Sequence, residues 1–150
     1  MTALKPITKD NINQVLDLKV NENQKSFVMT TAEALAKAYV YSKTAWPFAL
    51  YDDELLVGFI MMGYYEEKKY HTIWDLLIDY KYQGKGYGRK ALLLGIQFLF
   101  DSFKVREIYT GVAFGNQVEK KLYKSFGFEE TGFCGNGMEE LKLVPNTEQK

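Results

Sequence analysis

The sequence predicts an α/β domain in which helices cover both faces of a mixed sheet. Three observations lead to this prediction. Short β-type runs alternate with helical patterns along the chain, a hairpin pattern fills its middle, and a long amphipathic pattern follows a glycine-rich stretch. The length of 150 residues favours one domain, residues 1–150, with a single sizeable core.

The first elements are a short strand, two helices and a hairpin. The strand lies at LKPI, and Asp10 fits the N-cap of a helix that ends near Leu18. Thr30 and Glu33 have the spacing of a capping box, which predicts a second helix up to about residue 40. Two apolar runs around an acidic turn then predict the hairpin, with strands over 48–51 and 55–64.

The second half of the chain predicts three strands and two helices. The strand patterns are HTIWDLLID, EIYTGVAF and GMEELKLV. The strongest helical pattern runs from Gly86 to Phe103, because apolar residues recur there at helical spacing. NQVEKKLYKSF predicts the second helix, which Gly127 ends as a C-cap.

Composition excludes several classes of function. Lys and Arg total 19, as do Asp and Glu, so broad charge-driven binding to nucleic acid or to an anionic membrane is not expected. No apolar window is long enough to predict a transmembrane helix. Cys134 is the only cysteine, which rules out an internal disulfide and fits a reducing, cytoplasmic location. His71 is the only histidine, so we expect no metal site built from several histidines.

The stretch YQGKGYGRK at residues 82–90 predicts an anion site. It follows a strand and precedes the longest predicted helix, and it interleaves three glycines with basic residues. Successive glycine N–H groups can point into one concavity, and the start of the helix adds free N–H groups and a positive dipole end. Strand, glycine loop and helix together are typical of phosphate binding.

Three known anion loops compete for this stretch. A nucleotide P-loop fails, because no Gly-Lys pair is followed by Ser or Thr. A dinucleotide fingerprint does not fit either, because the spacing is GxGxG and the stretch lies past mid-chain. The third is the Q/R-x-x-G-x-G/A loop of the GNAT acetyltransferase superfamily, which the six residues from Gln83 to Gly88 resemble without a gap.

A second motif strengthens the resemblance to the GNAT superfamily. NQVEKKLYKSFGFEETG, about thirty residues later, resembles the N-x-x-A-x-x-L-Y-x-x-x-G-F segment of that family. Glu119 departs from the pattern, since it stands where the family usually has a small residue. Tyr80 stands where proline is common. The segment LDLKVNENQKSFV is similar to the bacterial spermine/spermidine acetyltransferase group of the family.

The resemblance implies a fold and an activity. The fold is a mixed, mostly antiparallel sheet of six to seven strands with helices on both faces. The activity is transfer of the acetyl group of acetyl-CoA, with no metal, to a primary amine such as spermine or spermidine by direct attack in a ternary complex. Another small amine or a protein N-terminus as acceptor, and a non-catalytic acyl-CoA-binding regulator, remain alternatives. Family members often form homodimers.

The resemblance also assigns the cofactor site residue by residue. In the family, the strand before the loop holds the pantetheine through backbone groups, and the N–H of Ile78 is the expected donor to the thioester oxygen. The loop holds the pyrophosphate, with side-chain charge from Lys85 and Arg89, although Gln83 can instead cap the loop. The implied cofactor-binding residues are Leu76, Leu77, Ile78, Gln83, Gly84, Lys85, Gly86, Tyr87, Gly88, Arg89 and Asn116.

Two residues are candidates for catalysis. Tyr123 resembles the family's general acid, which reprotonates the leaving thiolate, and it shares a helix face with Asn116 seven residues earlier. Asn116 is the candidate pantetheine-binding residue or a helix N-cap. Asp75 is the best candidate for binding a cationic amine or taking its proton, although a surface carboxylate remains the alternative. Gly111 is a candidate for the place where the two central strands part.

Overall fold

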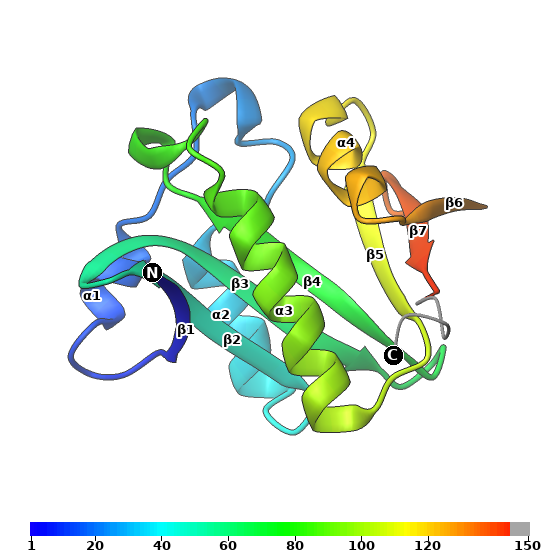
Figure 1. Ribbon diagram of the computed structural model, residues 1–150, viewed down its shortest axis with the longest axis horizontal. Helices are drawn as coiled ribbons and strands as arrows, with labels where there is room; N and C mark the ends of the chain where they lie inside the picture. The colour runs from blue at the N-terminus through cyan, green and yellow to red at the C-terminus, as the bar shows by residue number, and fades with distance from the viewer. Residues whose placement is uncertain (145–150) are drawn as a thin grey trace.

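A computed structural model describes residues 1–144 and shows one seven-stranded sheet with the order β1-β2-β3-β4-β5-β7-β6 (Figure 1). Every neighbouring pair is antiparallel except β4 and β5, which are parallel. The predicted mixed, mostly antiparallel sheet is confirmed. The strands are β1 (Thr2–Pro6), β2 (Ala45–Asp52), β3 (Leu55–Tyr65), β4 (Tyr70–Ile78), β5 (Ile108–Ala113), β6 (Glu129–Gly135) and β7 (Met138–Leu143).

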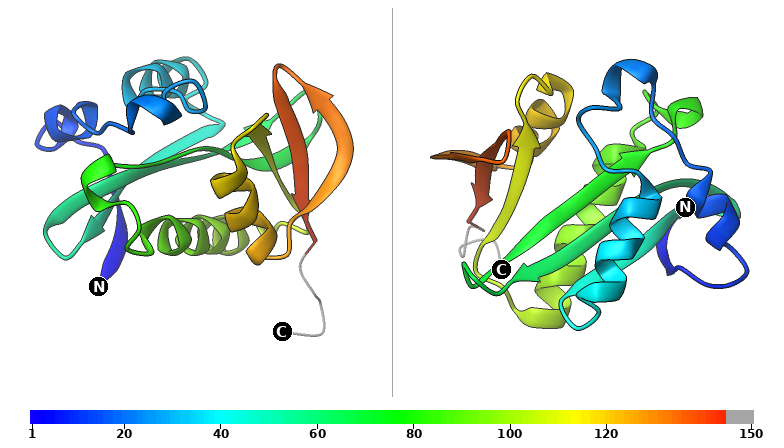
Figure 2. Two further views of the ribbon diagram at one scale, coloured as in Figure 1. Left: turned by 90° about the horizontal axis from the view of Figure 1, so that it is seen from above. Right: turned by 180° about the vertical axis from the view of Figure 1, so that it is seen from behind.

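Helices cover both faces of the sheet, as predicted. Figure 2 shows α1 (Ile12–Leu16) and α2 (Thr31–Val40) on one face and α3 (Tyr87–Phe103) on the other. α4 (Gln117–Ser125) follows β5, and two short 3₁₀ turns, η1 (Glu22–Gln24) and η2 (Tyr80–Tyr82), flank the connections. Within residues 1–144, no helix combines the length and the apolar content needed to cross a membrane.

The two cores arise from alternation along the central strands. Phe59 and Met61 of β3 pack against α1 and α2, whereas Ile60 and Met62 face α3. Both sets are fully buried. Because the central strand is apolar on both sides, a helical layer on each face is needed to remove it from water.

The helix ends can be compared with three caps that the sequence predicts. The Thr30 hydroxyl accepts a hydrogen bond from the Glu33 N–H at 3.1 Å, so the predicted N-cap at Thr30 is confirmed, while the Glu33 carboxylate accepts from the Thr30 hydroxyl at 3.3 Å and not from its N–H. Gly127 follows α4 with φ of +100°, as a glycine that ends a helix should. The N-cap at Asp10 is wrong. The cap position is Asn11, which uses its side chain to tie the preceding loop at the N–H of Thr8, 2.8 Å away.

Strand β6 is an element that the sequence patterns did not predict. All seven of its residues are exposed, so no apolar alternation marks it. It forms a hairpin with β7 through Asn136 and Gly137, which both adopt positive φ. The strand therefore depends on its neighbour's hydrogen bonds and not on burial of its own side chains.

The parallel strands β4 and β5 part in the middle of the sheet. They pair only from His71–Ile108 to Ile73–Thr110, while β4 continues to Ile78. The Thr110 hydroxyl donates to the Ile73 carbonyl at 3.0 Å and closes the paired part. Gly111 follows Thr110 in β5 and therefore lies where the two strands part, as the sequence predicts. The irregularity in register lies in β4, where Trp74 is the extra residue opposite β3.

Candidate active site

A cleft of about 420 Å³ lies along β4 beyond the point where β5 parts from it. Its walls come from β4, the glycine stretch and start of α3, the N-terminal half of α4, and the segment before α2. Ten of the eleven cofactor-binding residues predicted from the sequence line it. They are Leu76, Leu77, Ile78, Gln83, Gly84, Gly86, Tyr87, Gly88, Arg89 and Asn116.

The glycine stretch forms an open cradle at one end of the cleft. Gly84 and Gly86 have φ of +78° and +86°, a backbone region that glycine adopts without strain. A Cβ added at either position would meet no atom within 4 Å, so glycine is needed there for conformation and leaves space beside the backbone. Gly86 is the N-cap of α3 without a side-chain cap, which leaves the first N–H groups of the helix for a ligand.

Two side chains hold the loop in this shape. The Gln83 amide donates to the Ile78 carbonyl and to the Gln24 side chain, both at 3.0 Å. Buried Asp79 accepts from the N–H of Lys19 at 3.1 Å, which ties the loop to the segment before α2. Gln83 therefore caps the loop, which is one of the two roles that the sequence predicts for it.

The other side chains of the loop differ in where they point. Arg89 lines the cleft but donates to Ser125 of α4 at 2.7 Å. Tyr87 lines it too, while its hydroxyl donates to Asp52 at 2.5 Å. Lys85 is exposed and is the one predicted cofactor residue that does not line the cleft. The anion cradle thus consists mainly of backbone N–H groups.

The strand wall offers backbone groups to the cleft. The N–H of Asp79 bonds to Val57 of β3 at 3.0 Å, so the preceding N–H, that of Ile78, points to the opposite edge of β4. That edge has no strand beside it, because β5 has already parted. The position fits the expected donor to a thioester oxygen.

Asn116 occupies the start of α4 on the opposite wall. Its side-chain oxygen accepts from the N–H of Glu119 at 3.4 Å, so it is the N-cap of α4. Its amide NH₂ group donates to no atom of residues 1–144 and lines the cleft. One side chain therefore serves both roles that the sequence left open, cap and candidate cofactor contact.

Three ionisable side chains lie in or beside the cleft wall: Glu119 lines the cleft, whereas Asp75 and Tyr123, the two predicted catalytic residues, do not. Asp75 lies on β4, and Glu119 and Tyr123 lie one turn apart on α4. Asp75 is 7% exposed, Tyr123 is 2% exposed, and Glu119 is half-buried in the cleft wall. The Tyr123 ring also packs edge-on against Phe128, with ring centroids 5.1 Å apart, so the side chain is part of the core as well.

Burial shifts the pKa of each member of this cluster. Burial raises the pKa of Asp75 to about 7, although the N–H of Leu76 opposes the rise. Burial and the Asp75 charge raise the pKa of Glu119 to about 8. Burial, followed by the Glu119 charge, holds the pKa of Tyr123 well above its usual value, against the effect of Thr110. Near neutral pH the Tyr123 phenol is protonated, as a general acid must be. The carboxyl groups of Asp75 and Glu119 are then each protonated for part of the time.

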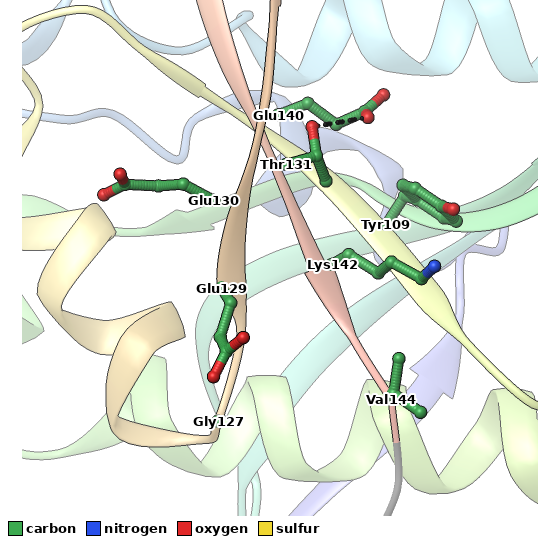
Figure 3. A pocket seen from close by; sticks show the side chains of 8 residues that line it. All are labelled: Tyr109, Gly127, Glu129, Glu130, Thr131, Glu140, Lys142 and Val144. Carbon is green, nitrogen blue, oxygen red and sulfur yellow. Dashed lines mark hydrogen bonds between the residues drawn. The ribbon is translucent and has the colours of Figure 1, made fainter.

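A second cavity, of about 510 Å³, lies on the outer part of the sheet between β5, β7 and β6 (Figure 3). Three carboxylates line it, Glu129, Glu130 and Glu140, with Lys142 as the one cation among the lining residues. Lys142 is already paired with Glu107 at 2.9 Å. An anionic cofactor would be repelled here, so the glycine cleft is the better candidate despite its smaller volume.

The remaining candidates lie away from this cleft. His71 is enclosed by Trp46, Tyr64 and Phe103, and burial lowers its pKa, so it is a neutral packing residue. Cys134 is exposed on β6 and does not line the cleft. Within residues 1–144, no group of three or more His, Cys, Asp or Glu side chains is arranged to hold a metal ion.

Some residues of the cleft were not found from the sequence. Val20, Gln24, Phe27 and Val28 close it from the segment before α2, which the sequence marked only through its similarity to the spermine/spermidine acetyltransferase group and not residue by residue. Glu119 carried a signal only as a departure from the family motif. The position of Glu119 in the cleft wall depends on how α4 packs relative to β4, which the sequence does not show.

Comparisons with known proteins agree with this geometry. A profile described as the Acetyltransferase (GNAT) family matches residues 12–128. The spermine/spermidine N(1)-acetyltransferase of Bacillus subtilis strain 168 is 39% identical over 137 residues, which cover 86% of this chain and 88% of that protein.

Solved structures show the same fold at lower identity. A spermidine N-acetyltransferase from Vibrio cholerae, in complex with CoA and spermine, superposes with a TM-score of 0.75 at 20% identity and covers 95% of each chain. An aminoglycoside acetyltransferase in complex with coenzyme A gives a TM-score of 0.78 at 16% identity, over 96% of this chain and 95% of that one. The family match, the close relative and the shared fold lead to one conclusion: this chain belongs to the GNAT family of acetyltransferases.

Proposed function

We propose that the protein transfers the acetyl group of acetyl-CoA to a primary amine of a polyamine such as spermine or spermidine. The observation that carries the proposal is one cleft with an anion cradle at one end and Glu119 in its wall, next to the buried Asp75 of β4, whose carboxyl group has an oxygen without a hydrogen-bond partner in residues 1–144. The name of the Bacillus subtilis relative supports the choice of acceptor. The proposal assigns the whole activity to one domain, residues 1–150.

The cofactor end binds through the backbone. The N–H groups of the glycine stretch and of the first turn of α3 would receive the pyrophosphate of acetyl-CoA, with Arg89 as the cationic side chain of the cleft. The edge of β4 and the Asn116 amide would hold the pantetheine. The N–H of Ile78 then stands where it can stabilise the oxyanion of the tetrahedral intermediate.

The acceptor end supplies the proton transfers. Asp75, half-ionised near neutral pH, would take a proton from the incoming ammonium group. The amine nitrogen then attacks the thioester carbon directly, without an acetylated protein residue. Tyr123 would donate its proton to the departing thiolate. Since Cys134 does not line the cleft, a covalent route through that thiol has no support.

The test is release of free thiol from acetyl-CoA with spermine, spermidine, lysine or a short peptide as acceptor. The proposal predicts turnover on the two polyamines with the highest kcat/KM in the panel. Faster turnover on lysine or the peptide would replace the polyamine with another amine. Tight binding of acetyl-CoA without turnover on any acceptor would indicate a regulator that only binds acyl-CoA.

We also propose that the protein acts in the cytoplasm as a homodimer. β6 forms one end of the strand order, and within residues 1–144 its outer edge pairs with no other strand. A Vibrio cholerae spermidine N-acetyltransferase of the same fold is described as dodecameric, so self-association has a precedent in this fold. Light scattering after size-exclusion chromatography should give twice the chain mass, and a monomer at micromolar concentration would contradict the proposal.

A further inference from the structure

Two carboxyl groups without an ion-pair partner in residues 1–144 lie in or beside the cleft: Glu119 lines it, and Asp75 directly precedes its lining residues on β4. Asp75 is 93% buried, by its 7% exposure, and its Oδ2 has no hydrogen-bond partner in residues 1–144. Glu119 lines the cleft from α4, near enough to Asp75 for the Asp75 charge to raise its pKa. Neither takes part in an ion pair within the described chain. An unpartnered buried carboxyl oxygen is rare in a folded protein and calls for a ligand or a proton.

The surroundings leave this end of the cleft with a net negative charge. From α2, Glu33 and Lys37 both act on Asp75, and they act in opposite directions. From α4 and β5, Tyr123 and Thr110 contribute only neutral hydroxyl groups at neutral pH. Lys37 lowers the pKa of Asp75, but Glu33 raises it by at least as much, so this cation does not neutralise the pair.

Two carboxyl groups in such a place favour one proton or one cation between them. Each charge opposes ionisation of the other in a medium of low dielectric constant. Burial is the main cause of the raised pKa values, about 7 for Asp75 and about 8 for Glu119, and the Asp75 charge adds to the rise at Glu119. An ammonium group satisfies the site, whereas a phosphate or a carboxylate would be repelled.

We propose that Glu119 and Asp75 form one acceptor site, in which Glu119 receives the substrate's ammonium group at the cleft wall and the carboxyl pair takes the proton that the nitrogen loses before attack. This inference rests on the proposed function, which it deepens by adding Glu119 as a catalytic residue. It also fixes the acceptor class as an aliphatic amine that is charged at neutral pH. An arylamine is neutral at this pH, so the carboxyl pair does not attract it electrostatically.

The protons balance over the cycle. The ammonium loses one proton to the carboxyl pair, and its nitrogen then forms the bond to the acetyl carbon. The carbon–sulfur bond breaks, Tyr123 protonates the thiolate, and the phenolate regains a proton from the acylated nitrogen. The proton held by the pair leaves to solvent with the products, so each turnover releases one proton overall.

The experiment compares Glu119→Gln with Glu119→Ala in thiol release from acetyl-CoA, over the same acceptor panel and from pH 6 to 9. Gln keeps the shape of the side chain but cannot take a proton. We expect both variants to lose roughly 100-fold in kcat/KM for spermidine, while the Kd of acetyl-CoA stays within about twofold. The acid limb of the pH profile should also change, because one of two coupled groups is gone.

Glu54→Gln is the matched control, since Glu54 is exposed in the β2–β3 turn and does not line the cleft. It should match the wild type in every readout, and thermal melting shows that all variants are folded. A Glu119→Gln protein that matches this control would overturn the proposal. So would a loss confined to acetyl-CoA affinity, which would make Glu119 a cofactor contact.

The outcomes separate this inference from the polyamine assignment. Turnover on a different aliphatic amine, with the same dependence on Glu119, would refute the polyamine acceptor and support the carboxyl pair. Turnover on spermidine that does not depend on Glu119 would support the polyamine acceptor and refute the pair. Equal turnover of an arylamine, such as 4-aminobenzoate, would refute the acceptor class that the pair implies.

Discussion

The two ends of the cleft are built in different ways. The cofactor end is one continuous stretch of chain, in which two glycines with positive φ and a helix start present backbone N–H groups. The acceptor end joins side chains from two strands and a helix: Asp75, Thr110 and Tyr123 come from β4, β5 and α4. A backbone site tolerates many side chains, whereas a side-chain site changes with each substitution. The predictions below test this difference.

The largest effect is expected at Tyr123. Tyr123→Phe keeps the ring that packs against Phe128 and removes only the proton donor. We expect kcat to fall on the order of 100-fold or more, with little change in the KM of acetyl-CoA. Steady-state thiol release measures both constants. Tyr39→Phe on the outside of α2, where the side chain is 85% exposed, is the control, and equal activity of the two variants would remove Tyr123 from the mechanism.

A large effect on stability is expected at Asp75, with a definite dependence on pH. Its pKa rises from 3.8 to about 7 on folding, so the proton-bound form favours the folded state. The stabilisation is complete below pH 3.8 and is lost as the pH rises through 7, a loss on the order of 4 kcal/mol. Asp75→Asn removes this dependence.

Denaturant unfolding of the wild type and Asp75→Asn at several pH values tests this prediction. The free energy of unfolding of the wild type should fall relative to that of the variant between pH 4 and pH 8. A difference between the two proteins that is constant with pH would show that Asp75 is ionised freely in the folded protein and is not a buried base. The same variant should lose most of its turnover on amines.

A moderate effect is expected in the glycine loop. Gly86→Ala forces a side chain into φ of +86°, which costs roughly 1–2 kcal/mol and distorts the anion cradle. The KM of acetyl-CoA should rise while kcat changes little. Gly88→Ala is the comparison, because its Cβ would make ordinary contact with Leu122 at 3.5 Å in a helical backbone. Equal stability of the two variants would contradict the role of backbone conformation.

These tests bear on how much of the molecule the sequence predicted. The glycine cradle was found because its signal is local: a strand, three spaced glycines and a helix. Only one member of the proposed acceptor pair could be predicted, because Asp75 and Glu119 lie 44 positions apart in the printed sequence, on β4 and α4. Strand β6 was missed because it buries none of its own residues.

The smallest effect is expected in the ion pairs that join α4 to the β6–β7 hairpin. Lys124 and Lys120 hold the pKa of Glu130 at about 2, so this contribution is present above pH 4.5 and is lost as the pH falls through 2. The Lys124–Glu130 pair is exposed on both sides, so salt screens it. Lys124→Ala should lower Tm slightly at low salt and not in 1 M NaCl. A large loss of Tm at both salt concentrations would mean that α4 depends on this contact.

The most direct test of the central claim is the pH profile of kcat/KM for spermidine with the wild-type enzyme, from pH 6 to 10. If the carboxyl pair accepts a charged amine and deprotonates it in the cleft, the profile rises through about pH 7 to 8 and then stays level. If the amine must arrive neutral, the profile keeps rising tenfold per pH unit toward the ordinary amine pKa of about 10. The level profile is the predicted result, and the continued rise would contradict the account.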